Sequence, residues 1–330
     1  MSKPRCVVLD GWTLTEHVPG APSSIDEPSW DALAQCVDLT VHARSTPSER
    51  LARAAGARLV LTNKAVIDRA LFEALPELAY VGVMATGTNV VDLVAAKAQK
   101  VIVTNVPGYA TESVVAHVFG LMLELLMRTA EHAGAVSKGS WCQSSDFTFR
   151  LGSTLELAGR TIGIVGYGNI GQRVAEVAQA FGMRVLVAIR PTKARPSIVN
   201  VGFCDVDQLF AEADVISLHC PLNVETEGLV NARRLGLMKR DAILINTGRG
   251  PLVNESALRD ALAAGRIRGA GLDVLSVEPP KANHPLLNVP RCLVTPHVAW
   301  ATTAARHRLM QILVSNVVAF LGGNPLNRVA

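Results

Sequence analysis

Residues 161–171 read Thr-Ile-Gly-Ile-Val-Gly-Tyr-Gly-Asn-Ile-Gly, and the rest of the chain is organised around this stretch. Ile162, Ile164 and Val165 predict a short buried strand, and three glycines follow with G-x-G-x-x-G spacing. Apolar residues then recur at steps of three and four, which predicts a helix with one apolar face: Ile170, Val174, Val177, Ala178 and Phe181. The pattern is therefore a strand, a glycine loop and a helix.

The glycines of this loop suit the phosphates of a dinucleotide. Gly166 allows a tight turn, Gly168 lets a pyrophosphate approach the backbone, and Gly171 lets the helix pack closely on the strand. The start of the helix adds N–H groups and partial positive charge. Because a strand and a helix flank the loop, the motif predicts a dinucleotide site. We expect five residues to form it: Gly166, Gly168, Asn169, Ile170 and Gly171.

Composition describes an ordinary globular protein. A length of 330 residues predicts about two domains, and 49% hydrophobic with 18% charged residues is typical of globular chains. A net charge of +4 without blocks of like charge argues against a nucleic-acid or membrane surface. The six cysteines form no C-x-x-C pair, and the chain enters a strand without a signal peptide. We therefore expect a cytoplasmic protein with reduced thiols and no metal site.

Short apolar segments alternate with helical ones along the whole chain. Besides 161–165, strands are predicted at 5–9, 37–41, 58–61, 79–83, 101–103, 184–189, 215–219, 242–246, 269–274 and 292–295. Helices are predicted at 28–35, 47–55, 68–75, 90–98, 111–139, 254–264 and 301–321, with Asn254 and Gly265 marking the ends of one of them. This alternation predicts parallel sheets covered on both faces.

The predicted fold class is α/β, with two Rossmann-like or flavodoxin-like lobes and a cleft between them. Pro107 and Gly108 interrupt the first run of strands and helices, and the last helix comes after the second lobe is complete. We therefore expect a discontinuous substrate domain, residues 1–104 with 297–330. Residues 105–296 would form the dinucleotide-binding domain.

Three further clusters stand at or just after predicted strand ends, where ligands bind in open α/β sheets. They are Asn-Thr-Gly-Arg-Gly at 246–250, Asp-Val-Leu-Ser-Val-Glu-Pro at 273–279 and Thr-Pro-His-Val-Ala-Trp at 295–300. Hydride transfer to a carbonyl needs a proton donor, and His297 suits that role because histidine is the residue type that most often exchanges protons at physiological pH. Glu278 would orient its imidazole, and Arg249 would hold an anionic substrate through two N–H groups. Taken singly, each of the three also has a plainer interpretation as a surface or loop residue.

Together with the glycine loop, these clusters resemble the D-isomer-specific 2-hydroxyacid dehydrogenase family over essentially the whole chain. The first half is most similar to the glycerate dehydrogenase or hydroxypyruvate (glyoxylate) reductase branch. The stretches that carry this likeness are Val-Leu-Asp-Gly-Trp-Thr-Leu at 8–14, Leu-Thr-Asn-Lys at 61–64 and Met-Ala-Thr-Gly-Thr-Asn-Val-Val-Asp at 84–92.

The resemblance implies roles for further residues. Arg249, Glu278 and His297 match the catalytic positions of the family. The substrate would contact the backbone of Ala85, Thr86 and Gly87 and be bordered by Trp300. The remaining cofactor contacts would come from Thr111, His219, Cys220, Pro221, Thr247 and Asp273. The resemblance also implies a homodimer, with Trp141 in the arm that family members use at the interface. As a lone tryptophan, Trp141 equally suits ordinary packing, and Asp273 equally suits a turn.

The choice of nicotinamide is predicted from the end of the second strand of this lobe. An NAD enzyme carries an acid there, about 20 residues past the loop, to bind the ribose hydroxyls. This chain has Arg190 instead, and no acid follows until Asp205. Arg190 suits a 2′-phosphate, so we expect NADP to be preferred, with NAD possible. The alternative is a solvated basic loop.

The predicted activity is the NAD(P)H-dependent reduction of hydroxypyruvate or glyoxylate to a D-2-hydroxy acid, with the proton from His297. One alternative keeps the fold and changes the substrate to phosphite, phosphoglycerate or a bulkier 2-hydroxy acid. Another is a non-catalytic, dinucleotide-sensing protein like the corepressors built on this fold.

Overall fold

The computed structural model of the chain describes residues 3–15, 27–188 and 198–330. These residues divide into two compact units, residues 1–110 with 301–330 (unit 1) and residues 111–300 (unit 2). The sequence predicts these limits at 104/105 and 296/297. The assignment of one unit to the substrate and the other to the dinucleotide stays a prediction.

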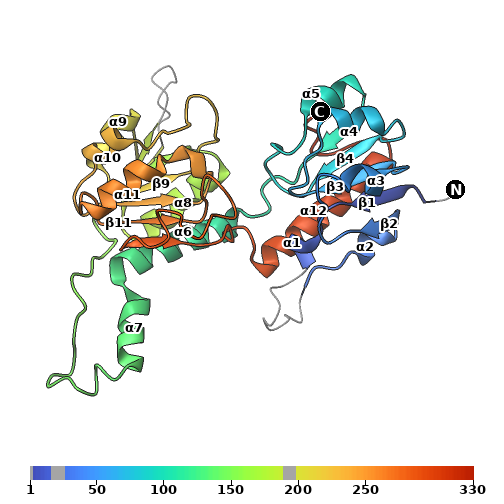
Figure 1. Cartoon of the computed structure of the whole chain (residues 1–330). Coiled ribbons are helices and arrows are strands. Elements are labelled where there is room, and N and C mark those ends of the chain that lie inside the picture. The colour runs from blue at the N-terminus through green and yellow to red at the C-terminus, as the bar shows by residue number, and fades with distance from the viewer. Residues whose placement is uncertain (1–2, 16–26, 189–197) are drawn as a thin grey trace. The chain divides into compact units, whose positions relative to one another are not determined.

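Unit 1 is built on a parallel five-stranded sheet with the order β2-β1-β3-β4-β5 (Figure 1). This is the flavodoxin-like order. Its strands are β1 (Arg5–Val8), β2 (Asp38–Val41), β3 (Leu59–Thr62), β4 (Tyr80–Val83) and β5 (Ile102–Thr104). Its helices are α1 (Trp12–Thr15), α2 (Asp31–Ala34), α3 (Arg50–Ala54), α4 (Arg69–Ala74), α5 (Leu93–Ala98) and α12 (Thr303–Leu321).

The last helix belongs to unit 1, as the sequence predicts. Thr302 caps α12 through its hydroxyl, which accepts the N–H of Ala305. The ring of Phe320 packs on that of Tyr80 in β4, with centroids 4.7 Å apart. Helix α12, at the end of the chain, therefore packs on the same sheet as β1, at its start.

Unit 2 is built on a parallel seven-stranded sheet with the order β12-β11-β10-β9-β6-β7-β8. Its strands are β6 (Thr161–Val165), β7 (Arg184–Ala188), β8 (Val201–Cys204), β9 (Val215–Leu218), β10 (Ile243–Asn246), β11 (Gly269–Leu272) and β12 (Cys292–Val294). Renumbered within the unit, the order is the Rossmann 3-2-1-4-5-6 with one further strand. Strand β8 and the two helices that follow it, α9 and α10, are absent from the sequence predictions.

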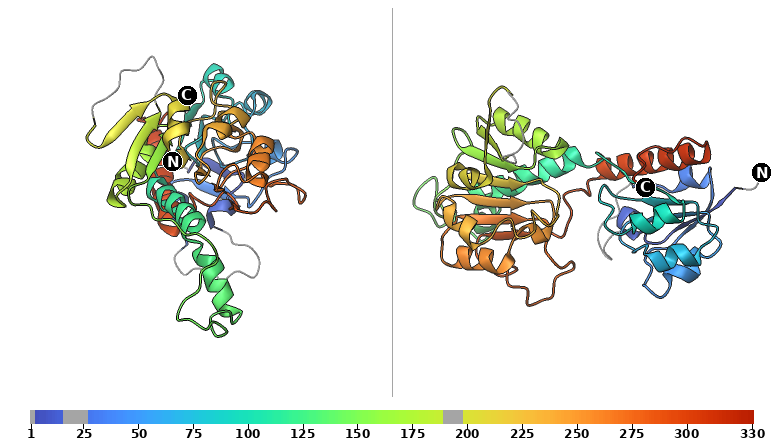
Figure 2. Two further views of the ribbon diagram at one scale, coloured as in Figure 1. Left: turned by 90° about the vertical axis from the view of Figure 1, so that its left-hand side faces the viewer. Right: turned by 90° about the horizontal axis from the view of Figure 1, so that it is seen from above.

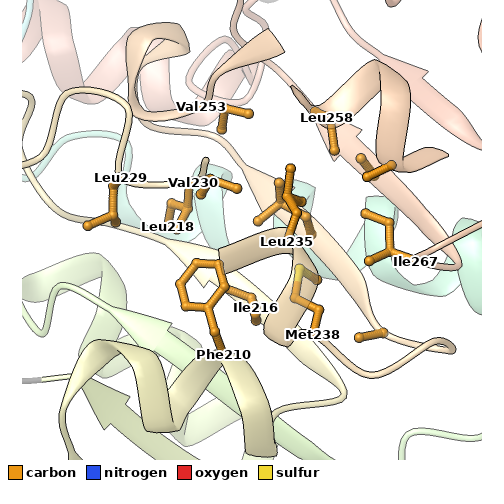
Figure 3. Close-up of a cluster of buried hydrophobic side chains, with 14 of the residues drawn as sticks. Phe210, Ile216, Leu218, Leu229, Val230, Leu235, Met238, Val253, Leu258 and Ile267 are labelled. Atoms are coloured by element: carbon orange, nitrogen blue, oxygen red, sulfur yellow. The ribbon is translucent and has the colours of Figure 1, made fainter. Parts of the chain in front are cut away.

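Helices cover both faces of the unit 2 sheet (Figure 2). The helices of one face are α6 (Thr111–Met127) and α8 (Asn169–Ala180). Those of the other are α9 (Val206–Glu212), α10 (Ala232–Leu237) and α11 (Glu255–Ala263). Between this second set and the sheet lies a core of fully buried side chains, among them Phe210, Ile216 and Leu235 (Figure 3). Burial of each such side chain contributes about 1.5–3 kcal/mol.

The sequence predicts one helix over 111–139, and this prediction is wrong. The structure has α6 and then α7 (Thr129–Ser137), with a bend of 60° between them. Arg128 at the break has a φ of 55°, and the Glu124 carboxylate accepts the N–H of Ala130 at 3.1 Å. Helix α6 buries a continuous apolar face, whereas α7 buries no residue. The helix therefore breaks where its contact with the core ends, which no glycine or proline marks.

Residues 128–153, here called the arm, consist of α7 and an irregular return segment that projects from unit 2 (Figure 1). The two halves of the arm meet at His132, whose Nδ1–H donates to the Arg128 carbonyl and whose Nε2 accepts the N–H of Leu151. Among the described residues no single helix is long and apolar enough to cross a membrane. Only α6 and α7 taken together pass that test of length and composition.

Candidate active site

The predicted residues of unit 2 follow the carboxyl ends of five parallel strands. Gly166 follows β6, His219 follows β9, Thr247 follows β10, Asp273 follows β11, and His297 stands shortly after β12. Strand β6 pairs with β7 on one side and β9 on the other, so the glycine loop lies where the strand order reverses. In doubly wound sheets this reversal is the place where ligands bind.

The glycine loop has the backbone that a pyrophosphate needs. Gly166 has a φ of 99°, and a Cβ there would lie 2.4 Å from the backbone N of Cys220. A Cβ at Gly171 would lie 2.1 Å from the Gly166 carbonyl oxygen, so neither position accepts a side chain. A Cβ at Gly168, the N-cap of α8, would meet no atom within 4 Å. The space beside Gly168 and the helix start therefore fits a dinucleotide phosphate.

His219 and Cys220 form the wall of the glycine loop. The N–H of His219 donates to the Val165 carbonyl at 2.7 Å, and its Nε2 lies 2.8 Å from the Ser217 hydroxyl. Burial lowers the pKa of the His219 imidazole to about 4. The side chain is therefore neutral at physiological pH and adds no charge beside the phosphate cradle.

Arg249 is carried by a loop that the buried Asn246 holds in place. The Asn246 Oδ1 accepts the N–H of Gly248 at 3.0 Å, and its Nδ2 donates to the Arg249 carbonyl at 2.9 Å. The Arg249 guanidinium itself is exposed. The Thr247 hydroxyl is buried and has no hydrogen-bond partner among the described residues. An unpartnered buried hydroxyl at this edge fits a polar group of a cofactor, such as a ribose.

The Arg249 loop packs directly on the loop that leads to Glu278. A Cβ at Gly250 would lie 2.0 Å from the carbonyl carbon of Leu275, so the two backbones touch. Glu278 turns back on the same loop, since its Oε1 accepts the N–H of Leu275 at 3.0 Å. The close approach of the backbones at Gly250 and Leu275 explains why a glycine follows Arg249.

Glu278 and His297 form a hydrogen-bonded pair. The Glu278 Oε2 lies 2.7 Å from Nδ1 of His297. A carboxylate at Nδ1 sets that nitrogen as a donor, which leaves Nε2 to exchange the other proton. The Nε2 atom has no partner among the residues that the structure describes. The pair therefore has the arrangement of an oriented general acid and base.

His297 is held in a left-handed conformation, with a φ of 55°. Asp273 stabilises this conformation, because its carboxylate accepts the N–H of Val298 at 2.9 Å and that of Ala299 at 2.8 Å. The Asp273 carbonyl also accepts the N–H of His297 at 2.9 Å. Such strain persists where surrounding contacts over-determine it, and it concentrates at functional sites.

Two histidines outside the predicted set support these loops. Nε2 of His117, on α6, lies 2.9 Å from the Thr295 hydroxyl, which donates to Asp273 at 2.6 Å. Nε2 of His284 lies 3.2 Å from the Glu255 carboxylate, which accepts the N–H of Ser276 at 2.7 Å. No sequence motif marks these residues, because each acts through a partner more than 20 positions away.

In unit 1 the predicted substrate loop follows β4. The Thr86 hydroxyl donates to the Val106 carbonyl at 2.9 Å, and Asn105 Nδ2 donates to the Thr86 carbonyl at 2.7 Å. The N–H groups of Ala85, Thr86 and Gly87 donate to no group within the described ranges. The loop therefore presents three backbone donors on an anchored frame.

A second anchor of that loop comes from residues that the sequence analysis gave no role. The Asp10 carboxylate accepts the N–H groups of Asn63, Lys64 and Ala65, at 2.8 Å for the first and last. The Asn63 amide then donates to the Met84 carbonyl at 2.7 Å. Burial raises the pKa of the Asp10 carboxyl, against these hydrogen bonds, which lower it. The position of Asp10 at the end of β1 is the signal that could have identified it.

The structure thus brings the unit 2 candidates to one sheet edge and the unit 1 candidates to another. Thr111 begins α6, and Trp300 and Pro221 lie in loops beyond β12 and β9. The Asp273 carboxylate is engaged by its own loop, so its contact with a cofactor stays a prediction. Arg190, on which the choice of cofactor rests, lies outside the described residues.

Comparison with known proteins identifies the family. The family model described as D-isomer specific 2-hydroxyacid dehydrogenase, NAD binding domain, matches residues 119–299. A hydroxypyruvate reductase of Blautia hydrogenotrophica is 40% identical over 98% of both chains. A glycerate dehydrogenase of Methylorubrum extorquens is 42% identical over 86% of this chain and 88% of its own.

Among solved structures, an NADPH-dependent glyoxylate/hydroxypyruvate reductase of Sinorhizobium meliloti, in complex with NADP and malonate, superposes with a TM-score of 0.83. It is 28% identical and covers 100% of this chain and 97% of its own. The relatives match across both units, and the family model spans the strand ends that carry Arg249, Glu278 and His297. This chain belongs to the D-isomer specific 2-hydroxyacid dehydrogenase family.

Proposed function

We propose that the protein reduces a small 2-ketoacid, hydroxypyruvate or glyoxylate, to the D-2-hydroxy acid with NADPH as the preferred reductant. The observation that carries this proposal is the pair of Glu278 and His297, 2.7 Å apart, with Nε2 of the imidazole left for the substrate. Relatives named for the same substrates, at 40% and 42% identity, support it.

The residues of the pair divide the work of proton transfer. His297 holds a proton at Nε2 and gives it to the carbonyl oxygen of the ketoacid as the alcohol forms. Glu278 accepts the Nδ1–H bond, fixes the ring and stabilises its charged form until the proton has moved. In the reverse direction the same nitrogen takes the hydroxyl proton.

Arg249 and the unit 1 loop hold the anionic substrate in this proposal. The Arg249 guanidinium offers paired N–H groups to the carboxylate and polarises the carbonyl. The N–H groups of Ala85, Thr86 and Gly87, which no described residue uses, bind carboxylate oxygens, and Trp300 borders the pocket. Two anchors on one carboxylate orient the carbonyl for reaction.

The cofactor is held by the glycine loop and by residues of the same sheet edge. The open position at Gly168 and the unpartnered Thr247 hydroxyl support this assignment. The other residues proposed to contact the cofactor are Thr111, Asn169, Ile170, Arg190, His219, Cys220, Pro221 and Asp273. When bound, the reduced nicotinamide supplies the hydride.

Preference for NADPH rests on the sequence after β7. An acid at this position would bind the ribose hydroxyls and repel a 2′-phosphate, and this chain has Arg190 in its place. The Arg190→Ala variant should lose far more affinity for NADPH than for NADH. An equal loss for both cofactors would contradict the phosphate contact.

Initial rates for glyoxylate, hydroxypyruvate and pyruvate, each with NADPH and with NADH, test the whole assignment. We expect the first two to be reduced fastest, and faster with NADPH. Activity with NADH alone would refute the role of Arg190. Turnover of none of the three would redirect the assignment to phosphite, a bulkier acid or a sensor.

We further propose that the protein is a cytoplasmic homodimer joined through the arm. Helix α7 buries no residue, and Phe147 and Trp141 are 89% and 52% exposed. None of the six cysteines, all within the described ranges, forms a disulfide, which suits a reducing compartment. We expect light scattering to give twice the 35.1 kDa chain mass, and Phe147→Ser to weaken the dimer. A monomeric wild-type protein would contradict this assembly.

A further inference from the structure

A polar cavity of about 370 Å³ lies at the amino edge of the unit 2 sheet. Arg268 directly precedes β11 and Arg291 directly precedes β12, and both line it together with Arg128, Glu124, Glu131 and Ser153. The catalytic candidates follow the carboxyl ends of the same strands. The cavity is therefore separate from the proposed active site.

The two glutamates of the cavity are already engaged. The Glu131 carboxylate takes a bidentate pair from Arg128, at 3.1 Å from Nε and 2.5 Å from Nη2. The Glu124 carboxylate accepts the N–H of Ala130 and so caps α7. Because Glu131 neutralises Arg128, the guanidinium groups of Arg268 and Arg291 are the cavity cations without a paired carboxylate from these two glutamates.

Arg268 is a buried cation that the protein satisfies only in part. It is 9% exposed, and it donates from Nη2 to the Ser153 carbonyl at 2.5 Å and from Nη1 to the Ser153 hydroxyl at 3.1 Å. Its buried Nε has no hydrogen-bond partner among the described residues. The nearest carboxylate, that of Asp241, is 3.9 Å away and 75% exposed, which is too distant for a hydrogen bond.

Burial and several nearby charges act on Arg268. Burial lowers the pKa of its guanidinium, and the charges of Arg160, Arg291 and Arg128 lower it further against the opposing charge of Asp241. Arg291 is exposed, and its guanidinium makes no hydrogen bond or ion pair with any residue that the structure describes. A buried charge without a full set of partners favours an anion beside it.

We propose that this cavity binds a small free multivalent oxyanion, of the phosphate or polycarboxylate class. A volume of about 370 Å³ corresponds to roughly twelve waters at about 30 Å³ each, so it has room for such an anion. Guanidinium forks match the paired oxygens of these ligands. The anion would also link the two ends of the arm to the sheet, because Arg128 begins the arm and Ser153 ends it.

The test is the thermal denaturation midpoint of the enzyme with saturating nicotinamide cofactor, titrated with inorganic phosphate at constant ionic strength. The bound cofactor keeps phosphate out of the glycine loop. We expect a saturable rise of about 5 °C at a hundredfold excess over the Kd. Arg291→Gln should weaken phosphate at least tenfold and leave kcat within twofold. The exposed Arg240→Gln, with the same change of charge, should behave as the wild type.

Two results would overturn the proposal. One is the absence of a saturable rise in the wild type. The other is a rise that Arg291→Gln retains in full. If that variant also loses its dimer in light scattering, the arginine meets a carboxylate of a second copy, not a free ion. Arg268→Gln provides a second variant, and its kcat shows whether it is correctly folded.

Discussion

The two units solve the same positioning problem with different groups. In unit 1, the groups that bond directly to the loop at 85–87 are neutral: Asn105 donates to the Thr86 carbonyl, and Thr86 donates to Val106. In unit 2, two carboxylates bond directly around His297: Asp273 accepts the N–H of Val298, and Glu278 binds the His297 imidazole. The first arrangement presents backbone donors, and the second presents ionisable side chains. We infer that unit 1 acts in substrate binding alone, whereas unit 2 adds proton transfer to its share of substrate binding.

The largest effect is expected from His297→Asn. Asparagine can still donate a hydrogen bond to the Glu278 carboxylate, but it has no second ring nitrogen that could give a proton to the substrate. Since a positioned general acid contributes roughly 10²–10⁴-fold, kcat should fall by about 10³. Cofactor affinity, measured by fluorescence titration, should stay within about twofold. Loss of cofactor binding together with kcat would show that the residue has a structural role instead.

A smaller effect is expected from Asn246→Ala, which frees the Arg249 loop by removing two hydrogen bonds. At about 0.5–1.5 kcal/mol each, their loss should lower kcat/KM by about 10–100-fold. Steady-state kinetics with glyoxylate measure it. Added guanidinium should not restore the rate if the arginine is merely misplaced. An unchanged kcat/KM would mean that this loop is held without Asn246.

The matched change in unit 1 is Asn105→Ala, which removes a single hydrogen bond to the substrate loop. We expect KM to rise by about five- to tenfold, with kcat within about threefold of the wild type. This variant tests the division of labour directly. A fall in kcat larger than the rise in KM would erase the distinction between the units.

The smallest effect concerns stability in acid. As the pH falls, one partly buried group in unit 2 lowers the free energy of unfolding, whereas one in unit 1 raises it. His219 has a folded pKa of about 4, below its ordinary value, because its partial burial disfavours the charged imidazole. The unfolded chain therefore takes up a proton first as the pH falls from about 6.5 to 4, and stability is lost over that range. Because solvent reaches part of the side chain, we expect the free energy of unfolding to fall by about 1–2 kcal/mol over this pH range.

Urea unfolding at pH 7 and pH 5 measures this loss. His219→Gln should reduce the dependence on pH. Asp10 in unit 1 acts in the opposite direction, because burial raises its folded pKa and acid therefore favours the folded state. Asp10→Asn should make the acid loss steeper. If both variants changed the slope in the same direction, the contrast between the two buried groups would be wrong.

Much of the fold was predictable because its signals are local. Buried parallel strands are short apolar runs, and the structure confirms each predicted strand to within one or two residues at either end. The cap of α11 by Asn254 and the left-handed Gly265 after it also follow from residue type. Strand β8 and helices α9 and α10 were missed, because each is only four to seven residues long and carries little periodicity.

The sequence by itself determined the family, the two parallel sheets and the identity of the groups that can do the chemistry. Glycine spacing and strand-end clusters are fixed by backbone geometry, which neighbouring residues encode. Only the tertiary structure decided where the helix breaks at Arg128, that Asp273 frames the loop of His297, and that Arg268 lies buried with an unpartnered Nε. Those features arise from contacts between segments up to 115 positions apart, such as Arg268 with Ser153, and no local pattern encodes such contacts.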